Sequence, residues 1–488
     1  MKKTQLNSSK YIGKSGYTIR KADYSELELH NIRNELTMTP ENPQLKKMMP
    51  HLQAPSFYIY QENKDKLYLP KFYGLEKIGI PEYSLCNDKK YLQKIKPIEI
   101  TFQGTLRDKQ HEIADLTIST LQKEHGSGGL LQLPCGFGKT ICALYILSKL
   151  KCKTMIIVHK EFLMNQWKER IEEFLPDAKV GIIKQKKVDT KGKDIVIAML
   201  QSLSMRSYDA SIFEDFGLAI YDEAHHMGAE VFSKCFSVVQ TKMMLGLSAT
   251  PDRKDGLSRV FHYYIGPVLA SIDTELKQDV YVKPIKIADK NAKEVIEENA
   301  AKINPRCDYI THLVMSEDRN EAIVSEILRL IQENEERQIL ILSERREHLK
   351  QIDDCLKMKN NQIQTGYYWG GLKQIELDFN SNAQVLFGTY SMSSEGMDIP
   401  SLNTVILASP KADIVQSVGR ILRRKHNLDP LIIDIIDTSY QSFVRQWYKR
   451  KQIYKDQGFL MYEENSNHTK EKEKEKEKTL GCVFSKER

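Results

Sequence analysis

The stretch from Leu133 to Thr140 has the composition of a loop that binds phosphate groups. Glycines let backbone N–H groups approach phosphate oxygens closely, and the helix expected after the loop offers the positive end of its dipole. We predict that Lys139 reaches the β and γ phosphates of ATP and that Thr140 binds Mg²⁺. Leu133 stands where the strict pattern has glycine, so a glycine-rich turn without a nucleotide is the alternative. The predicted nucleotide-binding residues are Pro134, Cys135, Gly136, Phe137, Gly138, Lys139 and Thr140.

Two adjacent carboxylates, Asp222 and Glu223, follow the apolar run 218–221. A site that hydrolyses a metal-bound nucleotide needs one carboxylate to hold Mg²⁺ and a second to accept a proton from the attacking water. We assign Asp222 to the metal and Glu223 to the general base. Such a pair at the end of a strand is usually a helix cap or a solvated pair, but here a phosphate loop precedes it and His225 follows it. The two motifs together favour a site that hydrolyses ATP.

Short apolar runs alternate with amphipathic segments from about residue 96, which is typical of a parallel sheet covered by helices. The carboxyl ends of parallel strands meet at one edge, so the polar residues after each strand should line one crevice. The expected strands are 128–133, 154–159, 194–200, 218–222 and 243–248. The polar side chains at these ends, besides those above, are His159, Lys160, Gln201, Ser202, His225, Ser248 and Thr250.

A second block of the same kind follows, but it has no phosphate loop of its own. On a helix, Gln416, Arg420 and Arg423 would share one face. The planar guanidinium group of arginine binds phosphate oxygens in a bidentate manner and neutralises the charge that develops on a transferred phosphoryl group. In isolation this cluster would be a solvated basic face; after the first block, it indicates a second part of the ATP site. The expected strands are 338–342, 384–389, 404–409 and 431–436.

The composition is that of a soluble globular protein of 488 residues, with 41% hydrophobic residues and a net charge of +7. This small positive excess permits a polyanionic partner without requiring one. The eight cysteines include no Cys-x-x-Cys pair, which argues against a zinc site and a disulfide framework. The first residues lack the apolar core of a signal peptide, and no apolar run reaches membrane-spanning length. We therefore expect a soluble, intracellular protein.

These patterns predict an α/β protein with two sheet domains, at residues 96–266 and 301–450. A charged linker is expected between them, at 267–300. Residues 1–95 carry no chemical motif and are expected to form a small accessory α+β domain. The polar tail at 451–488 contains alternating Lys and Glu and is expected to be disordered.

The order and content of the motifs resemble those of superfamily 2 helicases. The phosphate loop resembles motif I, whose first glycine this superfamily does not require, so Leu133 no longer counts against the nucleotide site. Upstream, Phe102 to Gln110 resembles the motif that recognises adenine, with Gln110 as the reader of the base edge. The resemblance covers roughly residues 96–445. The remaining matches are Asp222-Glu223-Ala224-His225 for motif II, a DEAH box, Ser248-Ala249-Thr250 for motif III, Thr389 to Asp398 for motif V, and Gln416 to Arg423 for motif VI.

The resemblance implies two tandem RecA-like domains with ATP bound between them. Gln416 would help to orient the attacking water, and Arg420 and Arg423 would stabilise the transition state. Contacts to phosphates carry no sequence information, so nucleic-acid binding should tolerate any sequence and weaken with salt. The residues expected to couple hydrolysis to the nucleic acid are His225, Ser248 and Thr250. Contacts to the nucleic-acid backbone are expected from His159, Lys160, Gln201, Ser202, Arg345 and Thr389.

The segments 134–140, 246–256 and 366–371 are similar to those of XPB-related DNA translocases, especially the transcription helicases of poxviruses and other large DNA viruses. This likeness implies ATP-driven 3′→5′ translocation on DNA or unwinding, in late viral transcription or transcript release, with the viral transcription machinery as partner. It also implies a location in the cytoplasmic replication factories of the host, and in the virion. RNA helicases with a DEAH box usually carry a further C-terminal module, whereas a short polar tail follows Arg423, which favours DNA.

Two other kinds of function stay open at this point. One is an ATP-dependent RNA helicase, or an ATPase that remodels duplex DNA without separating its strands. The other is a nucleotide-gated binding subunit with little turnover. The presence of Glu223 together with Arg420 and Arg423 argues against the binding subunit, because a protein that only senses the nucleotide needs no general base.

Overall fold

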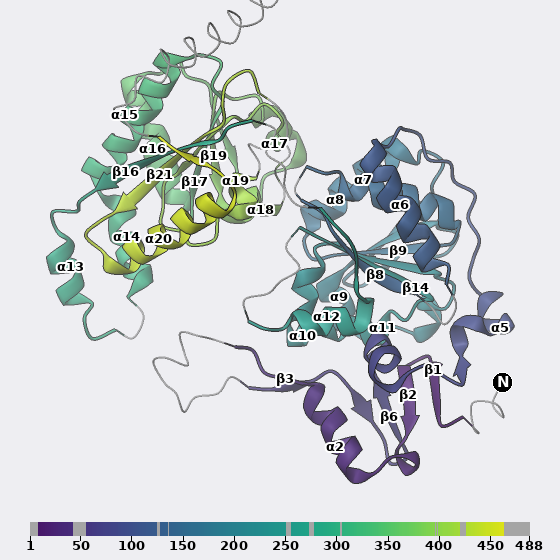
Figure 1. Cartoon of the computed structure of the whole chain (residues 1–488). Helices are drawn as coiled ribbons and strands as arrows, with labels where there is room; N and C mark the ends of the chain where they lie inside the picture. Colours follow the sequence, from purple (N-terminus) through teal and green to yellow (C-terminus); the bar gives the residue numbers. More distant parts are fainter. Residues whose placement is uncertain are drawn as a thin grey trace, which may run out of the picture. The chain divides into compact units, whose positions relative to one another are not determined.

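The computed structural model describes residues 8–41, 55–123, 127–134, 136–249, 255–272, 278–302, 305–395, 397, 399–419 and 426–462. The chain divides into two compact units, residues 1–274 and 275–488. Each unit contains its own parallel sheet (Figure 1). None of the helices in the described ranges combines the length and the apolar character that crossing a membrane requires.

An eight-stranded sheet forms the centre of the first unit, in the order β11-β10-β12-β9-β13-β14-β8-β15. All neighbouring strands are parallel except β10 and β11, which form an antiparallel hairpin. The five strands expected from the sequence are confirmed, while β10, β11 and β15 were not expected. The strands are β8 (Gly128–Gln132), β9 (Thr154–Val158), β10 (Val180–Lys184), β11 (Lys187–Val188), β12 (Ile195–Met199), β13 (Leu218–Tyr221), β14 (Met243–Ser248) and β15 (Val268–Ser271).

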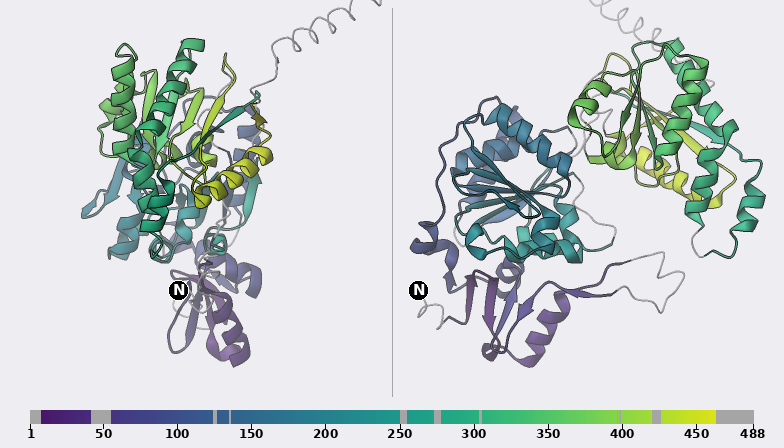
Figure 2. Two further views of the ribbon diagram at one scale, coloured as in Figure 1. Left: turned by 90° about the vertical axis from the view of Figure 1, so that its left-hand side faces the viewer. Right: turned by 180° about the vertical axis from the view of Figure 1, so that it is seen from behind.

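Helices cover both faces of this sheet (Figures 1 and 2). Successive residues of a strand point to opposite faces, so Ile156 belongs to one apolar cluster and Met155 to the other. The Ile156 face is covered by α6 (Asp108–Leu121), α7 (Lys139–Leu150) and α8 (Glu161–Phe174). The Met155 face is covered by α9 (Leu200–Met205), α11 (Cys235–Val238) and α12 (Ser258–Ile265), with α10 (Glu230–Ser233) between them in sequence.

The N-terminal residues form a separate five-stranded sheet in the order β5-β6-β2-β1-β7, flanked by α2 (Glu26–Glu35). This sheet belongs to the first unit because α4 (Lys71–Tyr73) packs on α12. The rings of Tyr73 and Tyr263 meet edge to face with centroids 5.1 Å apart, and Lys71 donates to the carbonyl of Lys242. The remaining elements are β1 (Lys10–Gly13), β2 (Gly16–Arg20), β3 (Thr37–Met38), β4 (Phe57–Tyr58), β5 (Gln61–Glu62), β6 (Lys66–Leu69), β7 (Tyr83–Ser84) and α5 (Lys89–Leu92).

The second unit holds a seven-stranded, all-parallel sheet in the order β18-β19-β17-β20-β21-β16-β22. The four strands expected from the sequence are confirmed. The strands are β16 (Tyr281–Ile287), β17 (Ile339–Ser343), β18 (Thr365–Tyr368), β19 (Val385–Thr389), β20 (Thr404–Leu407), β21 (Leu431–Asp437) and β22 (Leu460–Met461). The helices are α13 (Ala292–Glu298), α14 (Arg306–Met315), α15 (Glu317–Glu333), α16 (Arg346–Lys359), α17 (Gln374–Asn380), α18 (Tyr390–Glu395), α19 (Val415–Val418) and α20 (Gln441–Asp456).

The segment expected to be a linker, 267–300, instead contributes a strand to each sheet. β15 pairs with β8, and β16 pairs with β21 along its whole length. β16 was not predicted because Lys283 and Lys286 interrupt its apolar residues, so the segment contains no continuous apolar run. Such polar residues are tolerated because β16 lies near the edge of the sheet. The expected tail also begins with ordered structure, since α20 extends beyond residue 451 and β22 pairs with β16. The Lys/Glu run lies outside the described residues.

Two buried arginines in the second unit each pair with an aspartate of β21. Nε of Arg319 in α15 donates to Asp437 at 2.7 Å, and a second N–H donates to the carbonyl of Ala408 at 2.7 Å. Arg450 of α20 binds both carboxylate oxygens of Asp434, at 2.7 and 2.8 Å. These pairs tie the two helices to the sheet, and removing one partner would leave a buried charge uncompensated.

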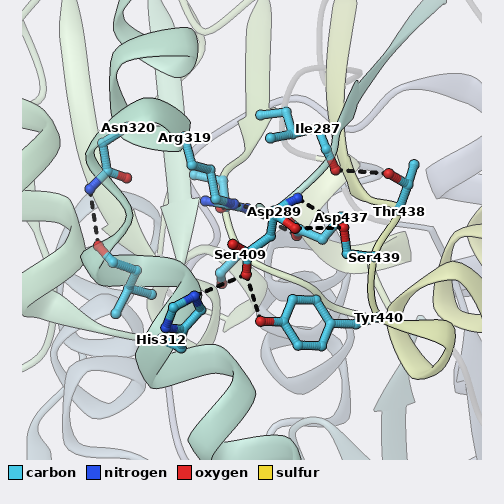
Figure 3. A network of polar contacts seen from close by, with 12 residues as sticks. Ile287, Asp289, His312, Arg319, Asn320, Ser409, Asp437, Thr438, Ser439 and Tyr440 are labelled. Atoms are coloured by element: carbon cyan, nitrogen blue, oxygen red, sulfur yellow. Dashed lines mark hydrogen bonds and ion pairs between the residues drawn. The ribbon is translucent and has the colours of Figure 1, made fainter. Parts of the chain in front are cut away.

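A further polar cluster lies beside Arg319 (Figure 3). Asp289, just after β16, accepts a hydrogen bond from the hydroxyl of Tyr440 at 2.6 Å. Nε2 of His312 in α14 lies 2.9 Å from the same carboxylate. The cluster therefore joins the end of β16 to α14 and to the start of α20.

Replacing Arg319 by Met should destabilise the second unit by about 3–5 kcal/mol, because the Asp437 carboxylate would stay buried without its partner. The free energy of unfolding measured by urea denaturation, with hydrogen exchange of β21 as a local probe, checks this. Lys290→Met is the matched control, because it removes an ion pair with Asp318 that is exposed on both sides. A similar loss in both variants would contradict the prediction.

Candidate active site

The loop between β8 and α7 has the backbone that phosphate binding needs. Gly136 and Gly138 have φ of +78° and +94°, in the region that glycine adopts without strain. A Cβ on Gly138 would lie 2.6 Å from Nε2 of Gln110, so a side chain here would displace the Gln110 amide. α7 begins at Lys139, and Nζ of Lys139 donates to the carbonyl of Leu133 at 3.1 Å. The N-terminus of the helix and the lysine therefore both lie at the loop. Cys135 lies outside the described residues.

Gln110 and Arg107 hold the loop from the side of α6. Oε1 of Gln110 accepts the backbone N–H of Arg107 at 2.9 Å, which caps the start of the helix. Nε2 of Gln110 donates to the carbonyl of Phe137 at 2.6 Å, and the Arg107 guanidinium donates to the same carbonyl. Gln110 is thus placed at the nucleotide loop, and its role as reader of the base edge stays a prediction. Arg107 was not among the residues predicted from the sequence, and its guanidinium also lies over the Phe137 ring.

Asp222 follows β13 and is buried, with 8% of its surface exposed. The indole N–H of Trp167, on α8, donates to its Oδ2 at 2.8 Å. Burial and the adjacent Glu223 raise the pKa of Asp222 to about 6, against the opposing effects of Trp167 and the Lys139 charge. No sequence motif pointed to Trp167, which looks like an ordinary apolar residue of an amphipathic helix.

Glu223 has a left-handed backbone, with φ of +47°, which is rare for a residue other than glycine. Its backbone N–H donates to Oδ1 of Asp222 at 3.1 Å. One oxygen of its carboxylate lies 3.4 Å from Nδ1 of His225, and the side chain is 15% exposed. The Asp222 carboxylate is therefore buried in the protein, whereas the Glu223 carboxylate is partly exposed. Partial exposure is what a general base needs to reach a water molecule.

Thr140 and Asp222 supply the oxygen atoms that Mg²⁺ prefers, so the residues present fit this ion. The Lys139 charge acts on Asp222, which indicates that the loop and the carboxylate face a common space. In the part of the chain that the structure describes, no group of three or more His, Cys, Asp or Glu side chains is arranged to hold a metal.

A row of three histidines runs beside the carboxylates. The ring of His226 lies between those of His159 and His225, with centroid distances of 4.0 and 4.3 Å. Nδ1 of His225 is 3.1 Å from the hydroxyl of Ser248, at the end of β14. The side chains of His225 and Ser248, predicted to act in coupling, are therefore brought together. The third predicted coupling residue, Thr250, lies outside the described residues.

Two known protein families match the two halves of the chain. Residues 103–253 match the family described as "Type III restriction enzyme, res subunit", and residues 289–425 match "Helicase conserved C-terminal domain". A protein of Acanthamoeba polyphaga mimivirus named "Putative ATP-dependent RNA helicase" is 36% identical over 461 residues, which cover 92% of this chain and 85% of the viral protein. The chain belongs to helicase superfamily 2.

Two further comparisons found similar proteins. A protein of Invertebrate iridescent virus 6 named "Putative helicase" is 28% identical over 75% of this chain and 84% of its own length. The crystal structure of the Pyrococcus furiosus Hef helicase domain is 16% identical, with a TM-score of 0.47, over 70% of this chain and 98% of that domain. Membership of the superfamily confirms the expected fold class, two tandem domains with RecA-like parallel sheets, and the expected enzyme class, a nucleic-acid-dependent ATPase.

The predicted nucleic-acid residues of the first unit lie at the ends of β9 and β12. His159 is buried in the histidine row, and its carbonyl accepts Nε2 of Gln201 at 2.6 Å. The Ser202 side chain is also buried, and its hydroxyl accepts the backbone N–H of Gln185 at 2.8 Å. Lys160 and Gln201 are partly exposed. Because His159 and Ser202 are buried, direct contact between their side chains and a nucleic acid is disfavoured. Lys160 and Gln201 are the more accessible of the four residues.

The predicted residues of the second unit follow β17 and β19. Arg345 is exposed, and its backbone N–H donates to the hydroxyl of Ser343 at 3.1 Å. Thr389 is buried at the end of β19, with its hydroxyl 3.3 Å from that of Ser391. Gln416 lies on α19, and Arg420 and Arg423 lie outside the described residues. The roles assigned to these residues stay predictions.

Replacing Glu223 by Gln should leave ATP affinity nearly unchanged and lower kcat at least about 100-fold, because the amide keeps the shape of the side chain but cannot accept the proton. Phosphate release measures kcat, and a fluorescent ATP analogue measures binding. An unchanged kcat would rule out Glu223 as the general base.

Replacing Asp222 by Asn should stabilise the metal-free protein at pH 8. The folded-state pKa of Asp222, about 6, exceeds its ordinary value of 3.8, so the stability contributed by its protonated form is lost as the pH rises from 3.8 through 6. The neutral amide avoids this loss, which is about 3 kcal/mol for a pKa raised from 3.8 to about 6. Unfolding temperatures in EDTA should differ most above pH 6 and least near pH 4. A difference independent of pH would contradict the raised pKa.

Proposed function

We propose that this helicase binds Mg²⁺·ATP at the carboxyl edge of its first sheet and uses hydrolysis to move along DNA or to unwind it. The observation that supports this most directly is the arrangement of strand ends. The phosphate loop, Asp222 and Glu223 follow β8 and β13, and the predicted polymer contacts follow the neighbouring strands β9 and β12. Hydrolysis and polymer contact would thus occur on one continuous edge.

In the proposed mechanism, each residue of the site has a separate role in ATP hydrolysis. Backbone N–H groups of the loop and Nζ of Lys139 would bind the β and γ phosphates. Thr140 and Asp222 would hold a Mg²⁺ ion, which would supply positive charge to neutralise the phosphates. Glu223 accepts a proton from the water that attacks the γ phosphate. Gln416 orients that water, and Arg420 and Arg423 balance the negative charge that develops in the transition state.

DNA is the polymer we propose, because the motif segments resemble those of XPB-related translocases with a DEAH box. By the same resemblance, the helicase would work with the viral transcription machinery, in cytoplasmic replication factories and in the virion. The viral origin of its relatives supports this setting. RNA is the second candidate, because the mimivirus relative carries the name of an RNA helicase.

ATPase activity measured without a polymer, with single-stranded DNA, with duplex DNA and with RNA of the same sequence tests the proposal. We expect strong stimulation by DNA and little by RNA, at fixed ionic strength. Stimulation mainly by RNA would replace the proposal with the RNA helicase. The absence of stimulation by every polymer would overturn both.

Arg423→Ala should lower the stimulated kcat about 1,000-fold while ATP affinity changes little, because the arginine acts on charge that is present only in the transition state. Arg424→Ala is the matched control, since it removes the same charge one position further along the chain. Equal losses in the two variants, or a loss in affinity as large as that in kcat, would contradict the assignment.

A further inference from the structure

A hairpin at one end of the first sheet carries a strong positive charge. Between residues 179 and 194 the chain has six lysines and two aspartates. Two of the lysines are neutralised: Lys184 pairs with Glu161, and Lys193 pairs with Asp189. Lys186 and Lys187 are exposed, and no ion pair with another described residue is seen for either. Lys186 lies in the turn of the hairpin formed by β10 and β11, and Lys187 is the first residue of β11.

The direction of β10 decides where this tip lies. β10 is parallel to β12, and β12 is parallel to β9, so all three strands end at the same edge of the sheet. The tip, Gln185 and Lys186, directly follows the last residue of β10. Along this edge the hairpin tip comes next to the end of β12 and then the end of β9. It therefore extends the line of predicted polymer contacts away from the ATP site.

The tip is held in place by contacts to residues after β12. Gln185 has a left-handed backbone, with φ of +53°. Its N–H donates to the hydroxyl of Ser202 at 2.8 Å, and its carbonyl accepts the hydroxyl of Tyr208 at 2.8 Å. An unfavourable backbone conformation persists where surrounding contacts hold it. The burial of Ser202, which disfavours a direct polymer contact, is thus explained by a supporting role beneath the tip.

We propose that Lys186 and Lys187 bind the phosphate groups of the nucleic-acid strand that lies along this edge. The inference rests on the proposed function, since it assumes a polymer there. Two adjacent, exposed ammonium groups, for which no carboxylate partner is seen among the described residues, suit the negative charge of a phosphodiester backbone. Such groups contact phosphates without reading sequence. Because hydrogen bonds already hold the tip in place, less conformational entropy is lost when the tip binds a nucleic acid.

Lysines also protect the edge strands of sheets from pairing with other chains. This explanation suits Lys187, which lies on the edge strand β11, but it does not account for Lys186 in the turn or for the anchoring of Gln185. The two explanations differ in what they predict for nucleic-acid binding, because edge protection has no effect on affinity for a polyanion.

The test compares Lys186→Gln/Lys187→Gln with Lys89→Gln/Lys90→Gln. The control removes the same two charges from adjacent, exposed lysines on α5, in the same unit. Fluorescence anisotropy gives the Kd of the full chain for labelled single-stranded DNA, duplex DNA and RNA, between 50 and 200 mM salt. The hairpin variant should bind about 5-fold or more weakly at low salt. The slope of log K against log salt should fall by about 0.7 per lost contact on a single strand and about 0.9 on a duplex.

An unchanged Kd and slope in the hairpin variant, or equal changes in the control, would overturn the inference and leave the proposed function intact. Failure of the wild-type protein to bind any of the three polymers would overturn the proposed function itself. The polymer whose binding shows the largest difference between hairpin and control variants identifies the strand that lies along the hairpin.

Discussion

Parallel pairing of the strands is the constraint on which the active site depends. In the first sheet, β8, β9, β12, β13 and β14 all run in one direction, so the loops after them meet at one edge. Lys139 and Asp222 are far apart in the sequence, and only this arrangement lets the charge of one act on the carboxylate of the other. An antiparallel neighbour within this set would have placed one of the loops at the opposite edge.

Two residues of the active site are in energetically unfavourable states that the surrounding fold maintains. Asp222 is buried beside a second carboxylate, and Glu223 has a left-handed backbone. The indole of Trp167 and the backbone N–H of Glu223 supply hydrogen bonds to the Asp222 carboxylate, which partly offset its burial. Such arrangements are typical of sites whose groups must be ready before the substrate arrives.

The edge of the first sheet divides into two halves. The ends of β8, β14 and β13 carry the residues assigned to ATP and to coupling, and the ends of β9, β12 and β10 carry those assigned to the polymer. His226 stands at the division, since its ring lies between that of His159, after β9, and that of His225, after β13. The three packed rings therefore connect the two halves physically, and the proposed coupling between ATP hydrolysis and polymer contact would cross the sheet here.

The sequence by itself determined the core strands of both sheets, because buried parallel strands appear in it as continuous apolar runs. It also predicted the nucleotide residues, because a phosphate loop depends on local backbone chemistry. Its predictions were wrong where strands are half polar, as in β16, because no apolar run marks them. Only the tertiary structure decided the partners of the site residues: Trp167 beneath Asp222, His226 between two other histidines, and the hairpin tip on Ser202. These contacts join residues distant in the chain, and side-chain types alone do not indicate which of them will meet.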